Sequence, residues 1–414
     1  MRVGMASPID LGALTSRLSD WDGLTGEWSF PYITQLTEAL LERGHDIHVF
    51  ALNSSTKEPR RYHGERLTVD VLPMREHGRD RIKDLYRLER EGLKSAIRES
   101  ACDVVHAHWT YEFGIAAVDS GKPTVVTAHH SPWVAVGDAR LRKPQLTGIG
   151  RYADMLKNGG RETVRALMSE YVVRNADVMT AVAPNVETHL NRWMFPRQPV
   201  RLIPNGLVPD PDTGSRALRD PEAPVFGLSA NGFGARKNTV TAVKAFNRLR
   251  QLRPRARLIL MGVGHEPDGP GQTWARSEGV DAGCEWRGEV PNSEAREALR
   301  REIDILVHTS HWEACSIAIM EAQALGVPVI GGRRSGGVSF SLKSGEAGLL
   351  VDVHEPSAVA AAMNTLVRDP TEFERLSIGG LEAIRSTFTM SGVLDAYEAT
   401  YADAIQLHAS SARR

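Results

Sequence analysis

The feature that most constrains this chain is a repeated alternation of short segments rich in β-branched residues with longer segments of helical periodicity. Such an alternation indicates parallel sheets whose connecting helices cover both faces. We expect strands at residues 2–7, 46–52, 67–74, 103–109, 123–130, 177–184 and 200–206, and again at 224–230, 257–264, 284–290, 304–310, 327–332 and 347–352. We expect helices at residues 32–45, 80–99, 238–252, 293–302, 356–367, 372–388 and 391–407.

The length of the chain indicates that this alternation belongs to two domains, because 414 residues exceed what one core usually organises. We expect a doubly wound α/β domain at residues 1–206, a Pro-, Asp- and Gly-rich linker at 207–223, and a second doubly wound domain at 224–390. A C-terminal helix and tail occupy residues 391–414. Ligands of such sheets bind outside the C-terminal strand ends, so the two domains are expected to face one another across a cleft.

Composition excludes several functional classes. Hydrophobic residues make up 42% and charged residues 24% of the chain, as in soluble globular proteins. A net charge of −1 gives no field that would favour nucleic acid. The three cysteines lie far apart without metal-ligand spacing, which indicates a reducing compartment. Neither an apolar leader nor an apolar run of about 18 residues occurs. We therefore expect a cytoplasmic protein, with contact to a membrane surface left open.

The segment at residues 308–332 carries two acids in an otherwise apolar helical stretch, Glu313 and Glu321. Glu313 lies just before a helix N-terminus whose N-cap is Ser316, where free backbone N–H groups can bind hydroxyl or phosphate oxygens. A carboxylate among apolar residues costs free energy unless a partner meets it. The spacing alone leaves two readings open: solvated acids, or acids that bind an elongated ligand with several hydroxyl groups.

This segment resembles the donor-site signature of retaining glycosyltransferases with the two-domain GT-B fold, family 4 in particular. The resemblance implies a C-terminal helix that crosses back to the N-terminal domain, contact of Glu313 with the donor sugar, and contact of Glu321 with the nucleotide ribose. The sequence departs from the family at 314–316, where Ala-Cys-Ser replaces the common Gly-Phe-Gly. The resemblance also implies that the backbone N–H groups of Cys315, Ser316 and Ile317 donate hydrogen bonds to sugar or phosphate oxygens. The matching residues are Ser310, Glu313, Glu321, Ala322, Ala324, Gly326, Pro328, Val329, Ile330, Gly336 and Gly337, followed by 345–352.

A second motif, at residues 229–246, matches the family's Lys-Asn pair with Lys237 and Asn238. The helix dipole disfavours a lysine at a helix start, so a functional role for Lys237 is favoured over a structural one. By resemblance, Lys237 stabilises the departing nucleoside diphosphate, a role for which cations are suited. The usual family arginine is replaced by Gly232, and Arg236 is the candidate to take its place. Gly232 is itself a donor-binding candidate, because glycine lets the backbone approach a phosphate closely.

The N-terminal half contributes fewer matches. The resemblance places His129, which ends a predicted strand, at the family's active-site histidine near the donor sugar. Gly26, with Glu27, is the best match to a glycine loop that touches the donor phosphate. Arg287 is a candidate neighbour of the nucleotide base or phosphate. His106 and His108 alternate along one strand and face the same way, but no third metal ligand at suitable spacing accompanies them.

Two further segments bear on metal and acceptor. The Asp-Pro-Asp at 210–212 imitates a metal motif of another glycosyltransferase class, but it lies in the predicted linker and indicates a turn. The resemblance implies basic side chains and helix dipoles where that other class uses a metal, so we predict no metal and no other cofactor. Seven lysines and arginines against three acids at 131–165 could meet an anionic acceptor or a lipid headgroup, although a solvated insertion is the plainer interpretation.

The resemblance thus implies a retaining, metal-independent glycosyltransferase that moves a sugar from a nucleotide-diphosphate sugar to a hydroxyl of a natural product, glycolipid or cell-surface glycan precursor. It names neither nucleotide, sugar, acceptor nor oligomeric state. Two alternatives stay open: a binding protein that has lost turnover, suggested by Gly232, and a glucan or disaccharide synthase or phosphorylase on the same fold. Replacing Lys237 with alanine is expected to lower turnover far more than fold stability.

Overall fold

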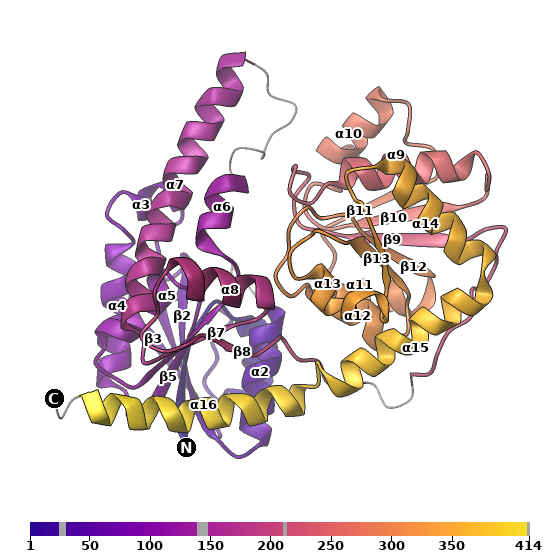
Figure 1. Cartoon of the computed structure of the whole chain (residues 1–414). Coiled ribbons are helices and arrows are strands. Elements are labelled where there is room, and N and C mark those ends of the chain that lie inside the picture. Colours follow the sequence, from indigo (N-terminus) through magenta and orange to yellow (C-terminus); the bar gives the residue numbers. More distant parts are fainter. Residues whose placement is uncertain (25–29, 139–147, 210–212, 412–414) are drawn as a thin grey trace. The chain divides into compact units, whose positions relative to one another are not determined.

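The computed structural model describes residues 1–24, 30–138, 148–209 and 213–411, and the chain divides into two compact units (Figure 1). Unit 1 comprises Met1–Arg140, Leu156–Asn205 and Met390–Arg414. Unit 2 comprises Leu141–Met155 and Gly206–Thr389. Within the described residues, no helix combines the length and the apolar character that crossing a membrane requires.

Unit 1 is built on an eight-stranded sheet of order β3-β4-β2-β1-β5-β6-β7-β8. Every pair is parallel except β3 and β4, which form an antiparallel hairpin at one edge. The sequence did not predict β3, because only its Tyr62 is buried and the apolar alternation of a strand is missing. The strands are β1 Arg2–Ala6, β2 Asp46–Asn53, β3 Arg60–Gly64, β4 Leu67–Pro73, β5 Val104–His108, β6 Thr124–Ala128, β7 Val178–Ala181 and β8 Arg201–Leu202.

The helices expected at residues 32–45 and 391–407 are present, whereas helices at 112–119 and 184–193 were not predicted, and one expected helix differs from the structure. The single helix expected at residues 80–99 is broken at Leu85 and Tyr86, which have positive φ angles of 57° and 60°. The break buries the Tyr86 ring completely, and its hydroxyl accepts a hydrogen bond from Arg165 at 2.9 Å. The helices are α1 Leu11–Leu14, α2 Pro31–Glu42, α3 Gly78–Ile82, α4 Arg87–Glu99, α5 Glu112–Asp119, α6 Pro132–Asp138, α7 Gly148–Asn175, α8 Pro184–Trp193 and α16 Met390–Ser411. Residues 148–155 of α7 are grouped with unit 2.

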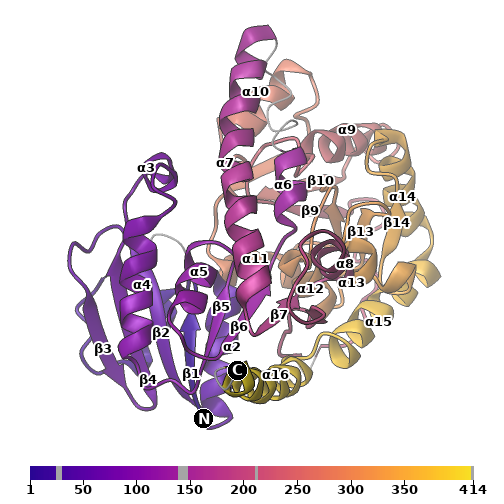
Figure 2. The same cartoon turned by 60° about the vertical axis from the view of Figure 1, so that its left-hand side comes forward.

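The C-terminal helix α16 packs on the sheet of unit 1, as the resemblance implied (Figure 2). It buries Tyr397 and Tyr401 completely against that sheet. Arg43, which follows α2, binds α16 through the carboxylate of Glu398 at 3.1 Å and the carbonyl of Ser391 at 3.0 Å. Unit 1 therefore includes the C-terminal helix of the chain as well as its N-terminal part.

Unit 2 is built on a six-stranded parallel sheet of order β11-β10-β9-β12-β13-β14. The chain runs from β9 outward to β11 and then returns to the other side of β9 with β12, which makes the C-terminal ends of β9 and β12 the switch point of the sheet. The strands are β9 Val225–Ser229, β10 Arg257–Met261, β11 Cys284–Gly288, β12 Ile305–His308, β13 Val329–Gly332 and β14 Leu349–Val351. The helices are α9 Thr239–Arg250, α10 Pro270–Ser277, α11 Asn292–Arg301, α12 Ile317–Ala324, α13 Val338–Ser341, α14 Pro356–Arg368 and α15 Pro370–Ser386.

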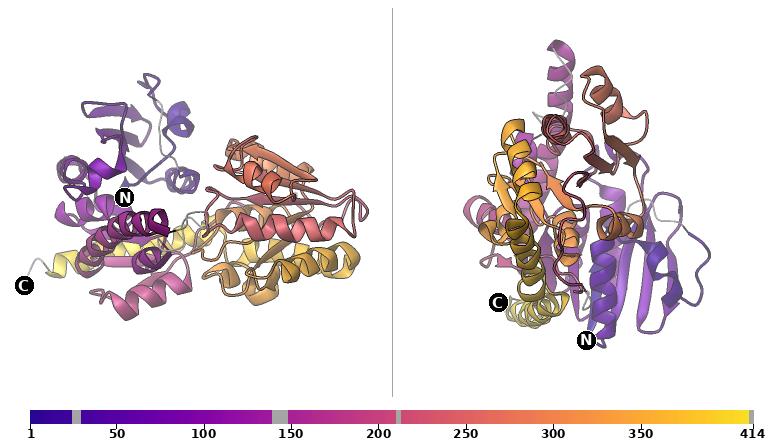
Figure 3. Two further views of the ribbon diagram at one scale, coloured as in Figure 1. Left: turned by 90° about the horizontal axis from the view of Figure 1, so that it is seen from above. Right: turned by 90° about the vertical axis from the view of Figure 1, so that its right-hand side faces the viewer.

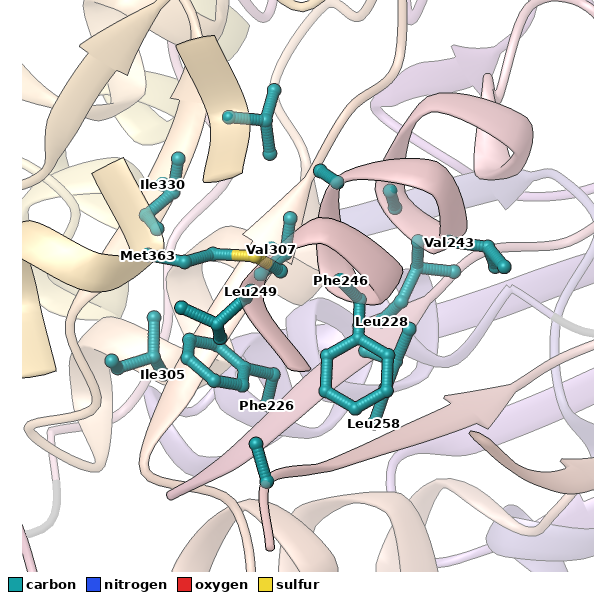
Figure 4. Packing of buried hydrophobic residues seen from close by; sticks show 14 of the residues in the cluster. Phe226, Leu228, Val243, Phe246, Leu249, Leu258, Ile305, Val307, Ile330 and Met363 are labelled. Atoms are coloured by element: carbon teal, nitrogen blue, oxygen red, sulfur yellow. The ribbon is translucent and has the colours of Figure 1, made fainter. Parts of the chain in front are cut away.

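Two apolar clusters cover the two faces of this second sheet. Leu258 and Leu260 of β10 belong to one cluster, and Ile259 and Met261 to the other, as expected where alternate side chains point to opposite faces. The first cluster packs Phe226 against α9 and α14 (Figure 4), and helices lie on both sides of the sheet (Figure 3). This packing of helices on both faces of the sheet fixes the C-terminal ends of β9 and β12.

The described part of the segment predicted as a linker lies bound to unit 2. The backbone N–H of Arg216 donates to Ser377 Oγ at 2.8 Å, and its guanidinium donates to the carbonyl of Leu299 at 2.8 Å. The Arg219 Nε donates to the carboxylate of Asp304 at 2.6 Å.

Candidate active site

The loops that follow β9 and β12 meet at the switch point of unit 2, and Asn238 joins them. Its side-chain amide donates to the carbonyls of Thr309 at 3.1 Å and Val353 at 2.8 Å, while the hydroxyl of Thr309 donates back to the carbonyl of Asn238 at 2.9 Å. Asn238 has a positive φ of 53°, a conformation that asparagine tolerates better than most residues. The Lys-Asn motif therefore contains a structural residue beside a cationic one.

Lys237 and Glu313 form the central contact of the site. Lys237 Nζ lies 2.6 Å from Glu313 Oε1, and Arg236 Nη1 lies 3.5 Å from the same oxygen. Arg236 also donates to the carbonyl of Trp312 at 3.4 Å. The structure thus brings Glu313 next to two adjacent cations that lie 76 and 77 positions before it in the sequence, on another loop.

The electrostatics of this cluster keep Glu313 ionised. Burial raises the pKa of the Glu313 carboxyl, but Lys237, with His308 and Arg236, lowers that pKa by more, so it lies well below its ordinary value. His308, the buried last residue of β12, places Nε2 3.7 Å from Glu313 Oε1 and was not singled out from the sequence. Its position at the end of a predicted strand was the available signal.

The backbone of Glu313 is held by the glycine pair of the motif. The Glu313 N–H donates to the carbonyl of Ser335 at 3.2 Å, and the Gly337 N–H donates to the carbonyl of Glu313 at 2.8 Å. Glu313 and Gly336 form an isolated parallel bridge. These contacts fix the carboxylate against the two cations.

Glu321 has a protein partner that the sequence analysis did not identify. Asn292 Nδ2, from the first residue of α11, donates to Glu321 Oε1 at 2.8 Å, and Glu321 is only 7% exposed. Burial raises the pKa of Glu321, and the hydrogen bond from Asn292 opposes that rise. Asn292 thus satisfies one of the two carboxylate oxygens of Glu321. The contact of Glu321 with the ribose stays a prediction.

The helix start at 315–317 is placed as the motif indicated. Ser316 is the N-cap of α12, with extended backbone angles and no hydrogen bond from its side chain to the helix. Cys315 is buried, and its Sγ lies 3.5 Å from the sulfur of Met320. Ile317 begins α12, so the first N–H groups of the helix start beside Glu313.

Gly232 and Arg287 lie in different settings. Gly232 has a positive φ of 103°, and its N–H donates to the carbonyl of Val263 at 2.7 Å. A side chain at this position would be strained by that backbone conformation. Arg287 binds both carboxylate oxygens of Glu302, at 2.8 and 2.6 Å, and Glu285 at 2.7 Å, so protein acids already hold its charge.

His129 belongs to unit 1, where it follows β6 directly. Its Nε2 lies 2.9 Å from His108 Nδ1, and the rings of Trp109 and Phe30 pack against it with centroid distances of 4.8 and 5.4 Å. Burial lowers the pKa of His129 to about 3. The candidate Gly26 lies outside the described residues, as do the turn predicted at 210–212 and residues 139–147 of the basic segment. Across the described ranges, no group of three or more His, Cys, Asp or Glu side chains is arranged to hold a metal ion.

Comparison with known families extends over most of the chain. Residues 31–210 match the family model "Glycosyltransferase Family 4", and residues 213–380 match "Glycosyl transferases group 1". Over 410 residues the chain is 26% identical to a D-inositol 3-phosphate glycosyltransferase of Stackebrandtia nassauensis, covering 92% of this chain and 88% of that protein.

Solved structures show the same architecture. Sucrose-phosphate synthase from Thermosynechococcus elongatus superposes with a TM-score of 0.75 at 20% identity, covering 99% of this chain and all of that one. Anabaena HepE in complex with UDP-glucose superposes with a TM-score of 0.61 at 15% identity, covering 97% of this chain and 99% of that one. At such identities the likeness shows the fold, and the predicted GT-B class is confirmed.

Proposed function

This chain belongs to the glycosyltransferases of family 4 and group 1, and on that premise we propose that it is a retaining, metal-independent enzyme that uses a nucleotide-diphosphate sugar. The observation that carries the proposal is the convergence of Lys237, Arg236 and Glu313 at the switch point of unit 2. Two cations beside an ionised carboxylate suit a ligand with a diphosphate next to a hydroxyl-bearing sugar.

Each residue then has a chemical task. Lys237 and Arg236 bind the diphosphate and stabilise the charge that develops as it leaves. Glu313 accepts hydrogen bonds from the sugar hydroxyls, and the first N–H groups of α12 meet sugar or phosphate oxygens. Glu321 accepts from the ribose hydroxyls while Asn292 holds its other side. Arg236 takes the place of the family arginine that is missing at Gly232.

The proposed reaction is a front-face displacement. The acceptor oxygen forms a bond to the anomeric carbon on the face from which the diphosphate departs, and the bond between that carbon and the diphosphate oxygen breaks. The acceptor proton passes to the leaving diphosphate, so the products are the retained glycoside and the nucleoside diphosphate. Because cationic side chains balance the charge, no metal is needed.

Thermal unfolding with UDP, GDP, ADP and dTDP tests the donor site. UDP is tested first, because HepE was solved with UDP-glucose. A nucleotide at about 100 times its dissociation constant adds about 2.7 kcal/mol of stability and raises the midpoint visibly. We expect Glu321→Gln to lose this rise and Glu294→Gln, at an exposed acid in the first turn of α11, to keep it. No rise with any nucleotide would contradict the proposed donor site.

Turnover with the matching nucleotide sugar separates the alternatives. The first acceptor to test is D-inositol 3-phosphate, the compound in the name of the relative, beside unphosphorylated inositol. We expect sugar transfer that retains the anomeric configuration. We also expect its rate to stay the same when a metal chelator is added. Nucleotide binding without transfer or donor hydrolysis would favour the binding protein, and phosphate-dependent release of sugar phosphate would favour a phosphorylase.

A further inference from the structure

His108 and His129 form a hydrogen bond between neighbouring strands of unit 1. His108 ends β5, and His129 follows β6, with which β5 pairs in parallel. His108 Nδ1 lies 2.9 Å from His129 Nε2, and the ring centroids are 5.1 Å apart. The pair sits at the C-terminal edge of the sheet, where ligands of such folds bind.

Both imidazoles are neutral at neutral pH. His108 is fully buried, and burial lowers its pKa well below the ordinary value, while the pKa of His129 is lowered to about 3. A neutral imidazole carries one N–H and one nitrogen lone pair. Their hydrogen bond therefore requires one ring to donate and the other to accept.

The second nitrogen of His108 decides the direction. His108 Nε2 is buried and has no hydrogen-bond partner among the described residues. If Nε2 carried the proton, a buried donor would be left without an acceptor, an arrangement that is rarer than an unpaired acceptor and costs about 1–3 kcal/mol. With the proton on Nδ1 instead, the donor of His108 is satisfied by His129.

We infer that His108 carries its proton on Nδ1, donates it to Nε2 of His129, and thereby fixes the proton of His129 on Nδ1. His129 Nδ1 has no hydrogen-bond partner within the described residues, so its N–H is available to a ligand. His108 is in this sense a positioning residue, which acts through His129.

The neighbouring side chain of His106 packs against this pair and forms its own hydrogen bonds with other residues. His106 stacks on His108 with ring centroids 4.1 Å apart, but its own nitrogens are engaged by Tyr401 Oη at 2.8 Å and Thr127 Oγ1 at 2.7 Å. Thr127 in turn shares a hydrogen bond of 2.6 Å with Thr180. The ring of His106, held by its own hydrogen bonds, thus packs against His108 and does not compete with His129 for Nδ1.

The fixed tautomer limits what His129 can do in the reaction, a step that rests on the proposed function. A neutral N–H can donate to a sugar or phosphate oxygen, but a protonated Nδ1 has no lone pair with which to take a proton from an acceptor hydroxyl. His129 is therefore a binding donor and not a general base through this nitrogen. The acceptor proton must go elsewhere, which agrees with its transfer to the leaving diphosphate.

Nuclear magnetic resonance of the full chain, labelled with ¹⁵N at histidine, reads the tautomer directly. Two-bond ¹⁵N–¹H correlations at neutral pH distinguish protonated from unprotonated ring nitrogens, and the signals lost in His129→Gln identify His129. We expect protonated Nδ1 and unprotonated Nε2 in His129. A proton on Nε2, or an imidazolium, would overturn the inference.

Three variants test the role of His108. His108→Asn keeps an amide donor near the position of Nδ1 and is expected to retain the tautomer and most activity. His108→Leu removes the donor, so a mixture of tautomers and a drop of about tenfold in kcat/KM are expected, the equivalent of about one hydrogen bond. Tyr401→Phe removes a partner of His106 only and is expected to leave the His129 tautomer unchanged.

The outcomes separate this inference from the proposed function. An unchanged tautomer in His108→Leu would overturn the inference, and if that variant does not fold, the wild-type spectrum and His108→Asn still decide. The inferred tautomer in a protein that neither binds a nucleotide nor transfers a sugar would leave the inference standing and remove the proposed function.

Discussion

At the scale of single residues, Lys237 and Glu313 depend on one another for stability as well as for chemistry. Lys237 is the nearest cation to a carboxylate that is only 12% exposed in its side chain. Lys237→Ala leaves this acid without its main partner, so a loss of about 2 kcal/mol in unfolding free energy is expected beside the loss of turnover. The sequence alone predicted that turnover would fall far more than stability and did not include this ion pair, which is visible only in the folded chain.

The double variant Lys237→Ala/Glu313→Gln separates the two effects. Removing the charge of Glu313 removes the need for its partner, so we expect urea unfolding to show that most of the lost stability returns. Turnover should stay low. If the double variant were no more stable than Lys237→Ala, the ion pair would not be the source of the loss.

Two glycines of unit 2 with positive φ angles differ in the space that a Cβ atom would have. Gly232 has a φ of 103° and open space where a Cβ would lie, whereas at Gly262, with a φ of 110°, a Cβ would lie 2.3 Å from the carbonyl oxygen of Ala230. Gly232→Ala is expected to cost about 1 kcal/mol from backbone strain alone. Gly262→Ala adds a steric clash and is expected to cost about 2 kcal/mol more. Equal losses in urea unfolding would contradict this account.

The candidate site residues that belong to a family motif could be located from the sequence. The side chains that contact them in the folded protein could not. Lys237 and Glu313 were identified because rare charged residues stood at family spacing. Asn292 and His308 come from other segments, and only the folded chain brings them to Glu321 and Glu313. No local pattern carries such tertiary contacts.

At the scale of elements, β5, β6 and α16 enclose a layer of neutral histidines that makes unit 1 sensitive to acid. Burial lowers the pKa of His106 and of His129 to about 3 from an ordinary 6.5. Between these pH values the unfolded chain binds protons that the folded chain does not. The stability contribution is therefore full above pH 6.5 and declines as the pH falls toward 3.

Urea unfolding at several pH values measures this effect. Each such histidine is expected to remove roughly 1 kcal/mol of stability between pH 6.5 and pH 5.5. His106→Gln can still bond to Tyr401 and Thr127 but takes up no proton, so its stability should fall less over the same interval by about that amount. A pH dependence equal to that of the wild type would show that His106 is not among the titrating groups.

Two of the features that the sequence missed, the strand β3 and the break between α3 and α4, share one cause. The strand β3 buries Tyr62 alone, and the break between α3 and α4 depends on Tyr86 reaching Arg165 in α7. Both follow from contacts distant in sequence, which override local periodicity. The buried parallel strands, by contrast, carry continuous apolar runs that identify them at once.

At the scale of the whole molecule, unit 2 interrupts unit 1 in the sequence, because Asn205 and Met390 both belong to unit 1. Each unit has its own sheet, and unit 2 has clusters on both faces of its sheet. Calorimetry is therefore expected to resolve two transitions. His106→Gln should move the transition of unit 1, and Gly232→Ala that of unit 2.

Nucleotide binding provides the final test of this assignment. Lys237, Arg236, Glu313 and Glu321 all belong to unit 2, so a bound nucleoside diphosphate should raise the transition that Gly232→Ala lowers. At about 100 times the dissociation constant the gain is about 2.7 kcal/mol, and the transition sensitive to His106→Gln should move less. If the nucleotide raised only the transition sensitive to His106→Gln, the donor residues would have been assigned to the wrong unit, and Lys237 would lose its proposed role.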